Sequence, residues 1–202
     1  MNKPIVFKAA FTVVFFALCL SLVMGAKQKS VYAKAERATL SLSVNDELHC
    51  SATAISEYAI LTADHCFPTD EAVTFKIDGR EAKARKFARD GNDHVLILVD
   101  IAFEYKGEFA KVKAEKGDGI FYFGNPGLKQ LFRKGSVAGF DGKDTILDVN
   151  GWHGDSGAAI FNDQGKIISI VSEGYMHGIF KLVIVHEFAF TTTQYKDFGV
   201  IR

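Results

Sequence analysis

The stretch Ala59-Ile60-Leu61-Thr62-Ala63-Asp64-His65-Cys66 carries a histidine directly after a short apolar run. Similar runs of β-branched, aromatic and alternating residues lie on both sides of it, separated by turn sequences rich in Gly, Asp and Asn. Short runs at this spacing are typical of an all-β protein. The expected strands are 39–44, 50–55, 59–62, 72–77, 81–88 and 95–101, then 119–123, 130–140, 145–149, 158–161, 166–172 and 179–185.

These runs form two groups, one before Tyr105 and one after Gly117, with a polar linker at 106–116 between them. Two six-stranded antiparallel β-barrels are the economical arrangement, although periodicity alone does not separate barrels from a sandwich. We expect the first barrel at about 39–105 and the second at about 117–185. The tail, 186–202, is expected to hold a short C-terminal helix.

The composition fits a single folded domain of two lobes. The chain has 202 residues, of which 48% are hydrophobic and 24% charged, which excludes a disordered protein. Lys plus Arg and Asp plus Glu both number 24, so the formal net charge is zero. This balance excludes the basic bias of a dedicated nucleic-acid binder, and we expect no nucleic-acid partner.

The N-terminus is expected to be a targeting segment rather than part of the domain. Lys3 and Lys8 precede an uncharged apolar stretch that ends at Ala26, which indicates a signal peptide or a membrane anchor at 1–26. The basic residues that follow would favour a cytoplasmic C-terminal side by the positive-inside rule. We expect an apolar helix at 1–26, a linker at 27–38 and the folded domain at 39–202.

Three segments carry the residues that point to chemistry: the one ending in His65-Cys66, then Asp93 before an apolar run, then Gly154-Asp155-Ser156-Gly157. A serine hydroxyl needs a neighbouring base to act as a nucleophile, and that base needs a third group to hold its tautomer. The glycines of the last segment allow the backbone amides from Gly154 through Asp155 to Ser156 to converge on an oxyanion. The order His, Asp, Ser matches one known arrangement of a catalytic triad.

Together these motifs resemble the chymotrypsin-like, or trypsin-like, serine proteases over roughly 39–185. The segments 123–127 and 165–174 extend the resemblance toward small bacterial and viral HtrA-type peptidases, here expected without a PDZ domain. The resemblance implies a chymotrypsin-like fold and a disulfide between Cys50 and Cys66, which lie sixteen residues apart. Such a bond persists in an oxidising compartment, so we expect an exported protein, anchored to a membrane if its N-terminal segment is retained.

The resemblance also assigns roles to individual residues. His65 would be the general base, Asp93 would orient it, and Ser156 would be the nucleophile. The amides of Gly154 and Ser156 would form the oxyanion hole. The implied activity is that of a serine endopeptidase acting on proteins or peptides without a cofactor or metal.

Two features depart from the resemblance or refine it. No Ile-Val-Gly-Gly-like tetrapeptide precedes Cys50, so the oxyanion loop is expected to be ordered without a newly cleaved N-terminus. The specificity pocket would be formed by Asn150 at its base with Ser172, Glu173 and Gly174. A neutral amide there argues against basic substrate side chains, whose charge would be buried without a partner.

Three other functions remain as alternatives. An α/β-hydrolase would need the order Ser, acid, His, with His177 or His186 as its base, and a glycine where Ala158 stands. A zinc site at His49-Cys50 and His65-Cys66 would need adjacent strand residues to converge on one ion, although they point to opposite faces. A catalytically latent or non-catalytic binding module on the same fold would retain its effect after Ser156→Ala.

Overall fold

The computed structural model describes residues 24–46, 48–67, 75–177 and 180–200. The chain divides into two compact units, residues 1–33 and 34–202. Residues 24–38 are helical, where the sequence predicted a linker from residue 27; the segment lacks Gly and Pro after residue 26 and is rich in Ala and Lys, which favour helix. Residues 1–23 of the expected targeting segment lie outside the described residues. Within the described residues, no helix is long and apolar enough to cross a membrane.

The first sheet contains seven strands in the order β5-β4-β1-β2-β3-β7-β6, all paired antiparallel. Its tightest hairpin joins β4 to β5 through Asp78 and Gly79, whose φ angles of 49° and 74° are typical of a type I′ turn. The strands are β1 (Thr39–Val44), β2 (Leu48–Ala54), β3 (Ala59–Ala63), β4 (Phe75–Ile77), β5 (Arg80–Ala82), β6 (Ala84–Arg89) and β7 (His94–Val99).

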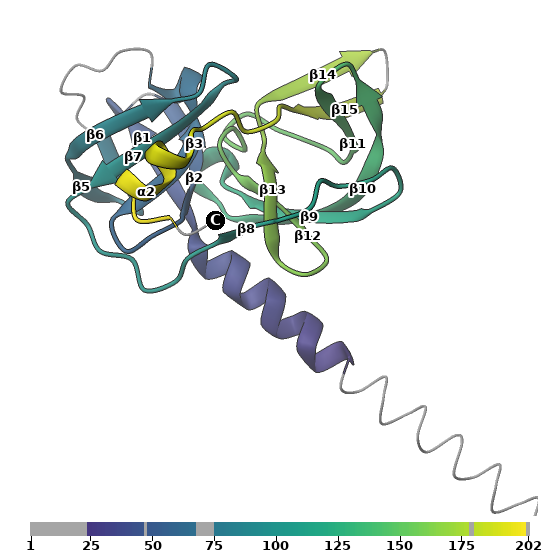
Figure 1. Ribbon diagram of the computed structural model, residues 1–202, viewed down its shortest axis with the longest axis horizontal. Helices are drawn as coiled ribbons and strands as arrows, with labels where there is room; N and C mark the ends of the chain where they lie inside the picture. Colours follow the sequence, from purple (N-terminus) through teal and green to yellow (C-terminus); the bar gives the residue numbers. More distant parts are fainter. Residues whose placement is uncertain (1–23, 47, 68–74, 178–179, 201–202) are drawn as a thin grey trace, which may run out of the picture. The chain divides into compact units, whose positions relative to one another are not determined.

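The second sheet contains eight strands in the order β14-β15-β11-β10-β9-β12-β13-β8. Every pair is antiparallel except β8 with β13. Figure 1 shows the two sheets side by side, the first in blue and the second in green. The strands are β8 (Glu108–Phe109), β9 (Gly119–Gly124), β10 (Leu131–Asp141), β11 (Asp144–Asp148), β12 (Ala159–Asn162), β13 (Lys166–Ile170), β14 (Glu173–His177) and β15 (Phe180–Val185).

The all-β, two-sheet architecture confirms the predicted fold class, but the described sheets contain seven and eight strands where six each were expected, and three differences account for the additional strands. The expected strand at 81–88 is divided into β5 and β6, because the Lys83 amide donates to the Asp100 carboxylate instead of to a neighbouring strand. The expected linker contains β8, which pairs with the start of β13. A further strand, β14, follows β13 directly and pairs with β15.

The C-terminal helix is present as α2 (Thr192–Asp197), which lies beside the first sheet in Figure 1. Its first turn has a capping box, in which the Thr191 hydroxyl accepts from the Gln194 amide and the Gln194 side chain accepts from the Thr191 amide. The Lys86–Asp197 ion pair and a bond from Gln194 to the Arg89 carbonyl tie α2 to β6. The chain therefore returns from the second sheet to finish on the first.

Each sheet has an apolar interior formed by alternate residues of its strands. In the first, Leu42, Ile60 and Leu96 are completely buried. In the second, the core cluster comprises Ile120, Tyr122, Val137, Leu147, Val149, Ala158, Ile160, Val171, Val183 and Val185. Tyr122 is the polar member of that cluster, and its hydroxyl group lies within hydrogen-bond distance of the Asn150 carbonyl and of Asp155, the residue before Ser156.

The structure contains the disulfide that the family resemblance implied, between Cys50 on β2 and Cys66 in the 3₁₀ turn η1 (Asp64–Cys66). Both sulfur-bearing side chains are buried. Closing a loop of this length stabilises a fold by about 3 kcal/mol, mainly by constraining the unfolded chain.

We predict that the double variant Cys50→Ala, Cys66→Ala loses about 3 kcal/mol of unfolding free energy. Urea denaturation followed by circular dichroism measures the loss, and the reduced wild-type chain is the control that should show the same decrease. Equal urea midpoints for the oxidised chain, the reduced chain and the double variant would contradict the prediction.

Candidate active site

His65 and Asp93 meet at the end of the first sheet because β3 and β7 pair there. The antiparallel register places Ala63 opposite His94, so the residue after β3 and the residue before β7 are neighbours. The Nδ1 atom of His65 lies 3.0 Å from each oxygen of the Asp93 carboxylate. The backbone amide of His65 also donates to Asp93 Oδ1 at 3.0 Å. Two donors of one residue therefore fix the carboxylate and the imidazole in one orientation.

The electrostatics of this pair favour the charged form of both groups. The hydrogen bond that His65 Nδ1 donates to Asp93 raises the pKa of His65 above its ordinary value, against the lowering effect of burial, and the Glu173 carboxylate adds to the rise. Burial raises the pKa of the Asp93 carboxyl, but the hydrogen bonds from the ring and backbone of His65 outweigh it and the pKa lies below its ordinary value. The His65 side chain is 45% exposed, so a substrate can reach it.

Ser156 lies in a turn of the second sheet that packs against the first sheet. Its carbonyl accepts a 2.7 Å hydrogen bond from the amide of Ser51 on β2. Gly157 follows in a left-handed conformation, φ 85°, and a Cβ atom there would lie 2.2 Å from both the Ser51 carbonyl oxygen and Thr62 Oγ1. The turn thus sits on β2 and β3, close to the point where β3 leads into His65.

Ser51 connects this turn to the rest of the protein through its hydroxyl group as well. The hydroxyl donates to the Gly154 carbonyl at 2.7 Å and accepts from the Asn125 amide at 2.9 Å. Its own carbonyl accepts from the Thr62 hydroxyl at 2.7 Å. One buried serine of the first sheet therefore holds two loops of the second.

The backbone of the turn leaves two amides for a ligand. Gly154 has φ 97°, and a Cβ atom there would lie 2.9 Å from the Asn125 carbonyl oxygen. Among the described residues, the amides of Gly154 and Ser156 have no protein acceptor. The Asp155 amide, which the sequence placed in the oxyanion hole with them, instead donates to the Trp152 carbonyl at 2.9 Å. The structure therefore corrects that assignment: Asp155 is not a free donor.

The Asp155 side chain points into the protein, where it is fully buried. Its Oδ2 atom accepts from the Tyr122 hydroxyl at 3.0 Å, the Trp152 amide at 2.9 Å and Arg133 Nε at 3.2 Å. Burial raises the pKa of this carboxyl, and the Arg133 charge opposes the rise. Gly124 makes room for it, since a Cβ atom there would lie 2.0 Å from Asp155 Oδ1.

The structure brings together some of the expected specificity residues. Val171 accepts from the Gly157 amide and donates to the Ala158 carbonyl, so the segment that continues into Ser172, Glu173 and Gly174 runs beside the nucleophile turn. Ser172 is buried and its hydroxyl has no hydrogen-bond partner in the part of the chain that the structure describes, whereas Glu173 and Gly174 are exposed at the start of β14. Asn150 is exposed, and its carbonyl accepts from the Tyr122 hydroxyl at 2.7 Å.

The Ser156 turn packs on β2 and β3, and His65 follows β3 in the chain. In the described structure, however, no hydrogen bond joins the Ser156 hydroxyl to the His65 imidazole. Such contacts are often long in unliganded enzymes and shorten in the substrate complex. The ligand atoms of Cys50, His65 and Cys66 lie within 4.8 Å of one another. However, the two sulfur atoms are bonded to each other, which removes the thiolates that the zinc alternative requires.

Three functional candidates carry little sequence signal: Ser51, Tyr122 and Arg133. Ser51 stands in an ordinary strand pattern, and Arg133 is one of two adjacent basic residues on β10. Tyr122 has a weak signal, because a hydroxyl at an inward position of an apolar run needs a buried partner. Their roles follow from contacts between distant parts of the chain.

Comparison with known proteins supports a trypsin-like peptidase fold. The family model of the trypsin-like peptidase domain matches residues 50–170. The active form of the Rv3671c protease from M. tuberculosis has a TM-score of 0.70 at 16% identity, covering 85% of this chain and 85% of that one. The serine endoprotease from Yersinia pestis has a TM-score of 0.68 at 20% identity, covering 85% of this chain and 66% of that one. No curated protein matches the sequence.

We predict that the imidazole of His65 titrates above the ordinary histidine range and that Asp93→Asn lowers its pKa. The carboxylate stabilises the charged imidazolium, and a neutral amide removes that stabilisation. NMR titration of the ring protons measures both values. Asp100→Asn is the matched control, because Asp100 bonds the Lys83 amide and does not contact His65. An unchanged His65 pKa in Asp93→Asn would disprove the electrostatic coupling.

Proposed function

The chain belongs to the trypsin-like peptidase domain family, and on that basis we propose that it is a serine endopeptidase that cleaves peptide bonds through an acyl-enzyme on Ser156. The observation that carries the proposal is the His65–Asp93 pair beside the Ser156 turn, with both Asp93 oxygens 3.0 Å from the imidazole Nδ1. That contact leaves Nε2 of His65 as the ring nitrogen available to a nucleophile or a substrate.

In the proposed reaction, His65 Nε2 takes the proton from the Ser156 hydroxyl as its oxygen attacks the substrate carbonyl carbon. Asp93 holds the Nδ1–H tautomer and stabilises the imidazolium that forms. The proton then passes to the leaving amine, and a water molecule hydrolyses the acyl-enzyme by the same steps in reverse roles. Because only neutral His65 acts as a base, the rate rises with pH through the raised pKa of His65.

The amides of Gly154 and Ser156 would stabilise the oxyanion. Each donor in such a hole is typically worth about 2.7–4 kcal/mol in the transition state. The support for this role is that neither amide has an acceptor among the described residues, while the neighbouring Asp155 amide does. The carbonyl and carboxylate groups of the Gly154–Ser156 turn already accept hydrogen bonds. The turn therefore needs little reorganisation when negative charge develops on the substrate oxygen.

The buried Asp155 contacts support a site that forms without proteolytic activation. In trypsin-like zymogens, a newly cleaved N-terminus orders this loop, and the sequence before Cys50 lacks the corresponding tetrapeptide. Here Arg133 and Tyr122, both from the second sheet, contact the Asp155 carboxylate. We propose that they replace the N-terminal amine.

Substrate preference and location are parts of the same proposal. The uncharged Asn150, which is exposed and whose carbonyl accepts from the Tyr122 hydroxyl, offers no acidic partner to a basic side chain, and this favours an uncharged side chain before the cleaved bond. A disulfide beside His65 favours an oxidising compartment, so the domain from residue 39 onward is proposed to act after export. Residues 1–26 would serve as a signal peptide or as a membrane anchor.

The test is covalent labelling of the chain with a fluorophosphonate, which reacts with activated serines. We predict labelling of the wild type, none of Ser156→Ala, and a decrease on the order of 10³-fold or more for His65→Ala. Ser136→Ala, on β10, is the matched control and should label like the wild type.

Two results would contradict the proposal. Equal labelling of Ser156→Ala and the wild type would place the reactive group elsewhere. A folded, disulfide-bonded wild-type chain that does not react would indicate a latent or purely binding protein on this fold.

A further inference from the structure

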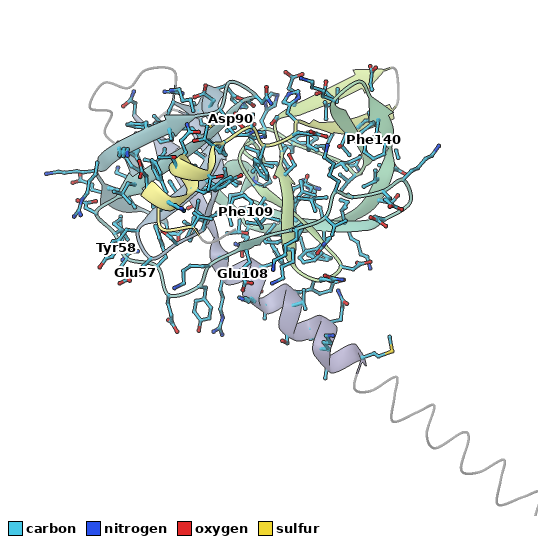
Figure 2. The ribbon with its side chains drawn as sticks, in the orientation of Figure 1. Glu57, Tyr58, Asp90, Glu108, Phe109 and Phe140 are labelled. Carbon is cyan, nitrogen blue, oxygen red and sulfur yellow. A yellow bond between two sulfur atoms is a disulfide. The ribbon has the colours of Figure 1, made fainter. Side chains whose placement is uncertain are left out.

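A second carboxylate–histidine pair lies three residues from Asp93 and has no place in the proposed reaction. Asp90 Oδ2 lies 2.6 Å from His94 Nδ1, and both side chains are completely buried. Figure 2 labels Asp90 near the C-terminal segment that returns to the first sheet. A buried ion pair is weak evidence for stability, because apolar residues of the same volume often serve as well. The position of this pair beside Asp93 points instead to a role in the geometry of the turn that contains Asp93.

Asp90 closes the turn that contains Asp93. Its Oδ1 atom accepts from the backbone amides of Asn92 at 2.8 Å and His94 at 3.3 Å. Its own amide donates to the His94 carbonyl at 3.2 Å. Asp93 lies inside this turn in a left-handed conformation, φ 63°, which is less favourable for a residue with a side chain than for glycine and which local hydrogen bonds can stabilise. The Asp90 carboxylate bonds the residues on both sides of Asp93 and so supplies that stabilisation.

Asp90 also binds the segment 186–191, which we call the C-terminal strap. Asp90 Oδ2 accepts from the Ala189 amide at 2.9 Å, and the Asn92 side chain donates to the Glu187 carbonyl at 2.9 Å. The Phe188 ring lies 4.6 Å from the His94 ring, centroid to centroid. The strap thus covers the buried Asp90–His94 pair and packs against the turn that contains Asp93.

The other end of the strap is attached to the second sheet. The Ser169 hydroxyl on β13 donates to the His186 carbonyl at 2.7 Å. His186 Nδ1 lies 2.7 Å from an oxygen of Asp144 on β11. One short segment therefore links the sheet that carries Ser156 to the turn that carries Asp93.

We propose that Asp90 is a positioning residue, which holds the Asp93 turn against the C-terminal strap and so sets the orientation of Asp93 toward His65. The inference rests on the proposed function only in taking His65 as the base. His94 acts through Asp90, since its ring nitrogen donates to the carboxylate and its face packs on the strap. Among the described residues, His94 Nε2 has no hydrogen-bond partner, which leaves the contact with Asp90 as the polar restraint on the ring.

The test compares Asp90→Asn with Asp100→Asn. Both changes are isosteric and each removes a carboxylate that accepts a backbone amide, but only Asp90 contacts the Asp93 turn and the strap, whereas Asp100 bonds the Lys83 amide. In Asp90→Asn an amide group would face the Ala189 and His94 donors, so the turn loosens. We expect the NMR pKa of His65 to fall and the rate of fluorophosphonate labelling to fall by on the order of 10²-fold, as for a small displacement of a catalytic group. Asp100→Asn should leave both within about two-fold of the wild type.

A purely structural role would lower the melting temperature of Asp90→Asn but leave the His65 pKa unchanged, and that result would overturn the inference. If Asp90→Asn does not fold, His94→Leu and His94→Asn replace it, since the asparagine amide can still donate to Asp90 near the position of Nδ1. His94→Asn should then retain more of the His65 pKa and labelling rate than His94→Leu, and equal values in the two would overturn the inference. The NMR titration needs no enzymatic activity, so a wild type that does not react with fluorophosphonate refutes the proposed function without deciding the role of Asp90.

Discussion

The carboxylate of Asp155 is the group on which the rest of the candidate site depends. It is fully buried, and a buried charge is costly unless it is paired and hydrogen-bonded. Tyr122, Arg133 and the Trp152 amide supply that pairing at Oδ2, whereas Oδ1 has no hydrogen-bond partner among the described residues. Asp155 directly precedes Ser156. The contacts that hold the Asp155 carboxylate inside the protein therefore also fix the orientation of Ser156 and of the neighbouring backbone amides. The turn from Gly154 to Ser156 is thereby shaped by contacts within the second sheet.

The nucleophile turn must also be placed against His65, which belongs to the other sheet. Ser51 provides this connection, because its amide and hydroxyl both donate to carbonyls of the Gly154–Ser156 turn. Ser51 follows Cys50, whose disulfide partner Cys66 follows His65. The residue that holds the turn and the residue expected to act as base are therefore linked covalently through one buried bond. The close approach at Gly157 explains why the turn needs a glycine on its far side.

Local patterns were sufficient to predict the all-β fold, the positions of most strands and the three segments that contain His65, Asp93 and Ser156. They also suggested the absence of an N-terminal activation mechanism, but not what takes its place. Tyr122 and Arg133 lie on adjacent strands, β9 and β10, and reach a residue more than twenty positions later. The role inferred for Asp90 depends on its hydrogen bond with the Ala189 amide. Such roles depend on tertiary contacts, which a single sequence does not encode in any short motif. The splitting of one strand at Lys83 and the pairing of β8 have the same origin.

The central claim is that an internal Arg133–Asp155 pair orders the oxyanion loop. The most direct measurement is the fluorophosphonate labelling rate of Arg133→Met in the 202-residue chain, compared with Lys134→Met, the adjacent exposed cation. The account predicts a large loss of labelling in Arg133→Met, with the His65 pKa unchanged and the Lys134→Met rate equal to that of the wild type. A wild-type rate in a folded Arg133→Met chain would contradict it, because Asp155 would then be held without the arginine.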